Sequence, residues 1–202
     1  VAWTDVTPVA VGHLLLIGLT VAIATTYQEH LLHRLRLQRE AHLDPLTLTM
    51  NRRGGVHHLD RMRVPYALLV LDLDAFKHVN DHHGHAMGDT VLVRCAKAFR
   101  AVLRPEDLLV RWGGDEFVVI TNMTAVEDVD HLVGRLRRAM RRVAVELDVS
   151  VDVSIGTALG RPDVSWQQTL SEADAMMYRR KIEGRKGRRR RRGRPSLGEP
   201  AD

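Results

Sequence analysis

Ten residues near the middle of the chain constrain its fold more than any other stretch. Residues 111–120 have the sequence RWGGDEFVVI, in which apolar runs at 108–112 and 117–120 flank two glycines and two adjacent acids. Two β-favouring runs joined by a glycine turn are typical of a β-hairpin. Glycines let a backbone approach a ligand closely, and carboxylates at a strand edge bind divalent cations. Asp115 and Glu116 therefore favour a metal–nucleotide site over a closed metal cage, although an ordinary solvated turn has the same composition.

A second acidic group follows a run of apolar residues. Residues 66–74, YALLVLDLD, end in Asp72 and Asp74 and are typical of a buried central strand. If this strand neighbours the hairpin, four carboxylates meet at one edge of the sheet and repel one another unless cations neutralise them. We expect two Mg²⁺ (or Mn²⁺) ions there, which polarise a phosphoryl group and activate a hydroxyl.

Residues around these acids suit a nucleotide. The backbone of residues 73–77 leads into a helix start, where free N–H groups attract phosphate. Lys181 on the last predicted helix and Arg185 just after it supply further phosphate contacts. Asn80 and Asp89 flank a histidine-rich loop. A carboxylate accepts two hydrogen bonds from the edge of guanine, a donor pair that adenine lacks.

The remaining pattern defines the fold class. Helices are expected at 52–62, 75–81, 87–103, 125–146 and 165–183, and a further strand at 149–159. This order predicts an α/β (α+β) sandwich, with helices packed on a mainly antiparallel sheet. Asp44-Pro45 is typical of a helix start. Cys95 lies among apolar residues and is expected to be a buried, inert thiol.

The first part of the chain predicts a membrane segment. Residues 9–27 are almost free of charge and are just long enough for a transmembrane helix; a buried core helix is the alternative. Arginines follow this run and none precedes it, which places the next domain on the cytoplasmic side of the inner membrane. The predicted organisation is a transmembrane helix in 1–27, a linker helix at 28–43, a globular domain at 44–185 and a basic disordered tail at 186–202.

The basic charge of the chain is confined to that tail. The formal net charge of the 202 residues is +5, yet residues 185–194 alone hold eight Lys and Arg residues, so the rest is slightly acidic. No aromatic residues interleave with these cations, so no specific nucleic-acid binding is expected, and anionic lipid is the second option. The adjacent histidines at 57–58 and 82–83 lack the spacing of a closed zinc site.

An ordered series of motifs from Asp44 to Arg185 resembles the GGDEF family of diguanylate cyclases. The motifs are Asp44-Pro45-Leu46-Thr47, Asn51-Arg52-Arg53, Asp72-Leu73-Asp74-Ala75-Phe76-Lys77, Asn80-Asp81, Gly84 to Asp89, Arg111 to Phe117, Ser154-Ile155-Gly156, Ala173-Asp174, Met177-Tyr178, Lys181 and Gly184-Arg185. The resemblance implies a fold similar to nucleotide cyclases and polymerase palms. It also implies a homodimer that condenses two GTP into cyclic di-GMP and releases two pyrophosphates.

The resemblance also implies roles for individual residues. Metal binding falls to Asp72, the Leu73 carbonyl, Asp115 and Glu116, with Glu116 either binding metal or activating the 3′-hydroxyl. The implied substrate contacts are Phe76, Lys77, Asn80, Asp89, Lys181 and Arg185. Arg104 and Asp107 match an inhibitory site for the product by their spacing to Gly113.

One position departs from the family pattern. Leu48-Thr49 stands where members usually have Gly-Leu, so we expect a strained or reshaped turn. Two other functions stay open, a catalytically silent cyclic di-GMP receptor and a membrane-tethered dimerisation module. The intact motif at 113–117 favours the cyclase.

Overall fold

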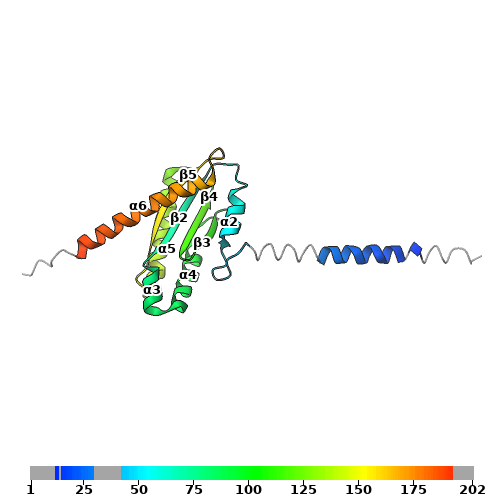
Figure 1. Ribbon diagram of the computed structural model, residues 1–202, viewed down its shortest axis with the longest axis horizontal. Coiled ribbons are helices and arrows are strands. Elements are labelled where there is room, and N and C mark those ends of the chain that lie inside the picture. The colour runs from blue at the N-terminus through cyan, green and yellow to red at the C-terminus, as the bar shows by residue number, and fades with distance from the viewer. Residues whose placement is uncertain (1–11, 14, 30–41, 193–202) are drawn as a thin grey trace, which may run out of the picture. The chain divides into compact units, whose positions relative to one another are not determined.

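The computed structural model describes residues 12–13, 15–29 and 42–192, with backbone only for 183–192. The chain divides into two units, Val1–Ala41 and His42–Asp202. In the first unit, residues 15–29 are helical (Figure 1). No helix among the described residues is both long and apolar enough to cross a membrane, so the transmembrane helix predicted at 9–27 is not confirmed. The linker helix predicted at 28–43 lies almost wholly outside the described residues.

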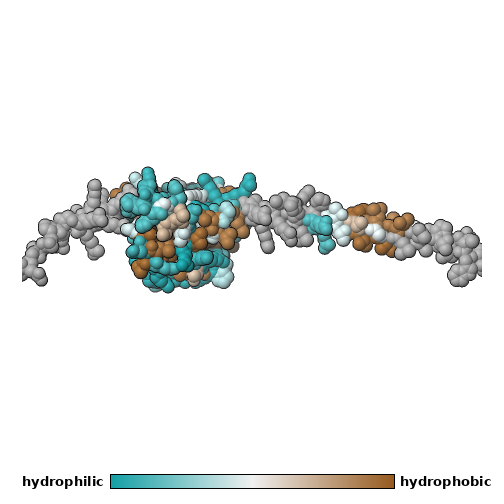
Figure 2. Space-filling model, turned by 90° about the horizontal axis from the view of Figure 1, so that it is seen from below, coloured by the Kyte–Doolittle hydropathy of each residue, from teal (hydrophilic) through white to brown (hydrophobic). Residues whose placement is uncertain are grey.

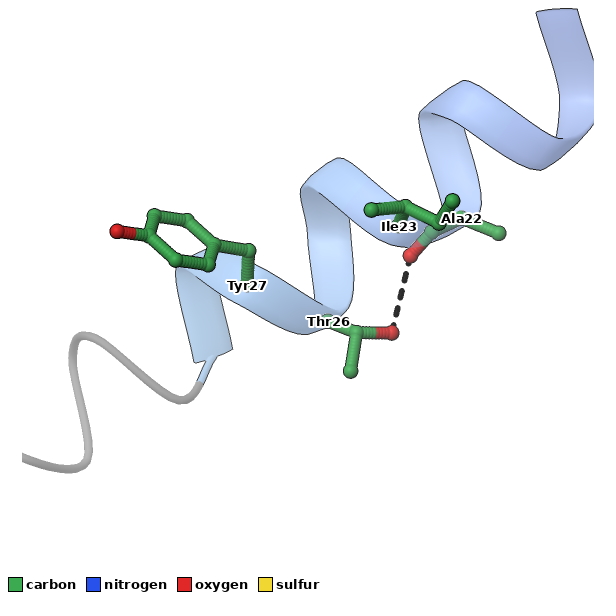
Figure 3. Close-up of a pocket in the computed structure, with 4 residues that line it drawn as sticks. All are labelled: Ala22, Ile23, Thr26 and Tyr27. Carbon is green, nitrogen blue, oxygen red and sulfur yellow. Dashed lines mark hydrogen bonds between the residues drawn. The ribbon is translucent and has the colours of Figure 1, made fainter.

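The helix at 15–29 has an apolar exterior. Figure 2 shows hydrophobic residues gathered along it, and Leu15, Ile17 and Ile23 are exposed. The threonine hydroxyls donate hydrogen bonds to carbonyls of the same helix. Thr26 Oγ1, for example, donates to the Ala22 carbonyl at 2.9 Å (Figure 3). Such back-bonding satisfies the hydroxyl without an outside partner. The described residues that line the pocket in Figure 3, Ala22, Ile23, Thr26 and Tyr27, include no charged side chain.

A five-stranded mixed sheet forms the centre of the second unit, in the order β1-β3-β4-β2-β5. The strands are β1 Met50–Asn51, β2 Tyr66–Asp74, β3 Leu108–Gly113, β4 Glu116–Thr121 and β5 Asp152–Gly160. Only the short β1 pairs in parallel, with β3; the other pairs are antiparallel. The mainly antiparallel sheet predicted from the sequence is therefore confirmed.

Helices cover both faces of this sheet (Figure 1). On one face, α4 His85–Arg100 and α5 Val126–Glu146 enclose the core residues Leu69, Leu71 and Phe117. On the other face, α6 Trp166–Arg192 packs Ala173 and Met177 against Leu68 and Val70. Alternate residues of β2 thus enter different cores, which explains its almost continuous apolar sequence. The shorter helices are α2 Arg52–Leu59 and α3 Phe76–His83.

Several predicted boundaries were wrong; α4, for example, begins at His85 and ends at Arg100, not at 87 and 103. Residues 44–47 form a turn instead of a helix start, because the Asp44 carboxylate accepts the Thr47 N–H at 2.8 Å and closes the chain on itself. The first helix ends at Leu59 and not at 62. The last helix continues to Arg192, so residues 186–192 are helical and not disordered, since Arg and Lys are good helix formers. The rest of the predicted tail lies outside the described residues.

Candidate active site

Strand pairing brings the acids of β2 and β4 together. Asp72 lies opposite Glu116 in the register of these two strands, and the Leu73 N–H donates to the Asp115 carbonyl at 3.3 Å. The expectation that the two acidic groups meet at one end of the sheet is confirmed. Asp74 lies beyond this contact, where its carboxylate accepts the Ser154 hydroxyl at 2.7 Å.

The two carboxylates at the turn between β3 and β4, Asp115 and Glu116, lie close to other negative charges. Burial raises the pKa of Asp115 above its ordinary value, and the nearby Asp72 raises it further. The pKa of Glu116 is also raised, first by burial and then by Asp72, Asp115 and Asp174. Lys181 lowers both pKa values but does not cancel the repulsion. A carboxylate with a raised pKa is better suited to accept a proton near neutral pH.

Lys181 reaches this cluster from α6. Its ammonium group is ion-paired with the Asp72 carboxylate and lies 3.9 Å from Asp74. The sequence predicts that Lys181 binds phosphate; the contact that the structure shows is its ion pair with Asp72. Arg185 follows one helical turn later on α6, and its side chain lies outside the described part of the structure.

The acids at this end of the sheet can be compared with what a metal ion requires. In the described ranges, no three His, Cys, Asp or Glu side chains are grouped so that they alone hold a metal ion. Mg²⁺ usually takes one or two carboxylates and completes its shell with water and substrate phosphate. The hard oxygen atoms of Asp72, the Leu73 carbonyl and Asp115 fit this demand, and their mutual repulsion favours a cation. The residues present therefore suit a metal that arrives with a nucleotide.

The predicted base-binding residues meet where α3 and α4 join. Gly88 on α4 packs so tightly on α3 that an added Cβ would clash with the Asn80 side chain and lie 3.2 Å from the Phe76 ring. Asn80 and Phe76 therefore pack against Gly88, one position before Asp89, which is exposed in the first turns of α4. Lys77 is exposed on α3.

The chain turns sharply between the acids and α3. Ala75 has a left-handed backbone with φ 64°, and no side chain caps the helix that follows. The first amide groups of α3 are therefore left without a side-chain acceptor, as a phosphate-binding turn requires.

Arg111 holds the turn between β3 and β4 in place, a role that the motif alone did not reveal. Its Nη1 donates to both Asp44 oxygens, at 3.0 and 3.1 Å. Its Nε and Nη2 donate to the Gly114 carbonyl, at 3.1 and 2.9 Å. One guanidinium thus joins the turn at 44–47 to the turn between β3 and β4. Arg111 and Asp44 both belong to motifs that are visible in the sequence, but only the fold shows that these two residues are in contact.

Leu48 confirms the expected strain. Its backbone is left-handed, with φ 57°, and its side chain is 74% exposed. A Cβ in this conformation is unfavourable and a glycine is not, which explains why Gly is usual here.

Arg104 and Asp107 form a closed turn. The Arg104 N–H donates to Asp107 Oδ2 at 2.8 Å, and the Asp107 N–H donates to the Arg104 carbonyl at 3.2 Å. Arg104 is exposed, whereas Asp107 is only 1% exposed and its Oδ1 has no hydrogen-bond partner among the described residues. Arg100 braces the turn from α4 through the Pro105 and Asp107 carbonyls.

A helix-flanked mixed sheet with acids on a hairpin turn defines an α+β domain of the GGDEF type. Residues 41–187 match the family model described as "Diguanylate cyclase, GGDEF domain". The chain belongs to the GGDEF family.

Similar proteins agree with this assignment. The chain is 34% identical over 158 residues to diguanylate cyclase DgcM of Escherichia coli K12, covering 74% of this chain and 38% of DgcM. It thus spans less than two fifths of that relative. A crystal structure of the coiled coil and GGDEF domain of Caulobacter crescentus DgcB with c-di-GMP has a TM-score of 0.73 and 29% identity, covering 83% of this chain and 95% of that one. Diguanylate cyclase SiaD of Pseudomonas aeruginosa, solved with its activator SiaC, has a TM-score of 0.69 and 33% identity, covering 89% and 74%.

Proposed function

We propose that this protein is a diguanylate cyclase, which joins two GTP molecules into cyclic di-GMP and releases two pyrophosphates. The observation that carries the proposal is the register of β2 and β4, which sets Asp72 opposite Glu116 and beside Asp115. The names of relatives such as DgcM support the reaction class. The c-di-GMP in the DgcB structure supports the product class.

In such a reaction, different side chains bind the base, the phosphates and the metal ions. Asp89 and Asn80 bind the guanine edge, and the first amides of α3 bind phosphate. Asp72, the Leu73 carbonyl and Asp115 would hold Mg²⁺, which would neutralise phosphate charge and lower the pKa of a hydroxyl. Lys181, which lies at the acid cluster on α6, and Arg185 one turn later would contribute positive charge to the phosphates.

Glu116 is placed to accept the proton of the attacking 3′-hydroxyl. The 3′-oxygen then bonds to the α-phosphorus of the second nucleotide, and the bond from that phosphorus to pyrophosphate breaks. One GTP lies in each of two copies of the chain, because each nucleotide must present its 3′-hydroxyl to the other. A homodimer is therefore part of the proposal.

Substitution of Glu116 tests this function. Glu116→Gln keeps the shape and removes the charge, and the loss of such an oriented group lowers turnover by about a hundredfold or more. Purified parent and variant are incubated with GTP and Mg²⁺, and cyclic di-GMP is quantified by chromatography. Glu106→Gln, on an exposed turn, serves as the control and keeps full activity. Equal turnover of Glu116→Gln and parent would refute the assignment, as would equal use of ATP.

We also propose that the chain is anchored at the inner membrane, with residues from 42 onward in the cytoplasm. The exposed apolar side chains at 15–23 support this location, as do the arginines that follow them. Extraction of membranes at high pH strips peripheral proteins, so the chain is expected in the pellet. Its release into the supernatant would contradict the proposal.

A further inference from the structure

On the solvent side of α5, acidic and basic residues lie at equal distances on opposite sides of one glycine. Gly134 lies near the middle of the helix, with Asp130 and Glu127 four and seven residues before it, and Arg138 and Arg141 four and seven residues after it. Spacings of four and seven residues keep side chains on one face of a helix. All four charged side chains are exposed, away from the stripe that packs in the core.

None of these four charges has an ion-pair partner among the residues that the structure describes. The described residues include all of α5, and only one of their ion pairs involves this helix. It joins Glu146, at the end of α5, to Arg94. The helix dipole favours acids at the start of a helix and bases at its end, but its effect fades within one turn. It does not explain Asp130 and Arg138, which lie in the interior of α5. Their arrangement points to a partner outside this copy of the chain.

We propose that α5 is a contact surface for a second copy of this chain, packed antiparallel across a two-fold axis at Gly134. Such an axis sets each residue opposite the one at equal distance on the other side. Arg138 then meets Asp130 of the second copy, Arg141 meets Glu127, and each pair occurs twice. The Arg138 guanidinium, 3.4 Å from where a Gly134 Cβ would lie, turns outward to do so.

Gly134 suits the crossing point of two helices. It has no side chain, so the backbones can approach closely. An anionic membrane or a nucleic acid fits less well, because such a partner would use the arginine half of the face and be repelled by Asp130 and Glu127. A second copy would pair Asp130 and Glu127 with arginines.

The direction of α5 gives this contact a consequence for the proposed cyclase. Strand β4 leaves the acid cluster at Glu116 and ends at Thr121, and β5 begins at Asp152 opposite Asp74. Helix α5 connects these strands, so it runs toward the acid end of the sheet. Two antiparallel α5 helices therefore point their acid clusters in opposite directions, and two bound nucleotides cannot meet. The pair is a resting dimer; this consequence rests on the proposed function, whereas the contact itself does not.

Cysteine crosslinking of the full chain tests the contact. A residue on a two-fold axis meets its own copy, so Gly134→Cys is expected to form a disulfide-linked dimer on mild oxidation at low salt. The native Cys95 does not compete, because burial raises the pKa of its thiol to about 12. Val145→Cys is the control. Val145 is 82% exposed, yet the two copies of this residue would lie about 33 Å apart along the direction of the paired helices.

Charge exchange gives the second arm of the test. In the Gly134→Cys background, Arg138→Asp or Asp130→Arg alone is expected to lower the dimer yield about tenfold, because each change turns two attractions into repulsions. Both changes together restore the yield, as the pairs re-form with reversed sign. Helical circular dichroism checks that each variant is folded.

Two results would overturn the contact. One is equal crosslinking at positions 134 and 145, or none at 134. The other is a double variant that crosslinks no better than either single variant. GTP is absent from these assays, so a failed contact leaves the cyclase proposal standing, and a failed cyclase assay leaves the contact standing.

Discussion

Arg111 and Asp44 are 67 positions apart in the sequence, yet Arg111 Nη1 donates to both carboxylate oxygens of Asp44. The same guanidinium donates to the Gly114 carbonyl. The start of the globular unit is therefore joined directly to the turn between β3 and β4, where Asp115 and Glu116 lie. A change in the position of the 44–47 turn is expected to displace the acids of that turn.

Replacement of Arg111 by lysine tests this coupling. Arg111→Lys keeps the charge but loses the planar fork that binds two partners at once. Stability is expected to fall by about 1–3 kcal/mol, and cyclase turnover by about tenfold to a hundredfold because the turn is misplaced. Urea unfolding and initial rates measure the two effects. Arg94→Lys is the matched control, since its pair with Glu146 is about half exposed and is expected to contribute little. Equal effects of the two variants would contradict the coupling.

The Asp44 carboxylate makes the stability of the domain depend on pH. Burial raises the pKa of Asp44, but hydrogen bonds from Thr47 and Arg111 outweigh this and lower it below its ordinary value of 3.8. A group whose folded-state pKa is lowered stabilises the fold above its unfolded pKa and loses this contribution as pH falls through the folded value.

Asp44→Asn therefore destabilises the domain by a constant amount at neutral and weakly acidic pH. The difference from the parent is expected to shrink only as pH falls below 3.8. Urea unfolding of both proteins at a series of pH values gives this difference. A difference that shrinks already between pH values of about 7 and 5, where Asp is ionised, would assign the effect to another group.

The left-handed backbone at Leu48 predicts a stabilising substitution. Leu48→Gly removes a Cβ from an unfavourable conformation and loses only an exposed side chain, so stability is expected to rise by about 1 kcal/mol. Leu48→Ala is the control because it removes the same apolar surface but keeps the Cβ. The midpoint of urea unfolding compares them. If Leu48→Ala stabilises the protein as much as Leu48→Gly does, the stabilisation comes from the loss of exposed apolar surface and not from relief of backbone strain.

Arg104 is proposed to bind the product cyclic di-GMP. It is exposed on a braced turn, and a guanidinium binds phosphate with two hydrogen bonds. Arg104→Ala is therefore expected to weaken inhibition by added cyclic di-GMP about tenfold or more, while the initial rate stays near that of the parent. GTP progress curves with and without product measure both. Lys97→Ala, an exposed cation on α4, is the control and remains inhibited. Equal inhibition of all three proteins would show that the turn has no regulatory role.

Local patterns in the sequence were sufficient for much of the fold. The apolar run at 66–74 gave β2 with its observed bounds, and the glycine turn gave the hairpin, because hydrophobic period and turn chemistry act over a few neighbouring residues. Residue type likewise identified the acids at Asp72, Asp115 and Glu116 and the family to which the chain belongs.

Only the tertiary structure decided which of these residues meet. The register that sets Asp72 against Glu116, the ion pair of Lys181 with Asp72, and the clamp of Arg111 on Asp44 all join distant parts of the chain. Buried Asp107 likewise differs from its exposed neighbour Arg104. Such relations depend on how strands pair and helices pack across the sheet, and a one-residue change of register would turn every side chain to the other face. Spacing along the chain carries no information about that choice.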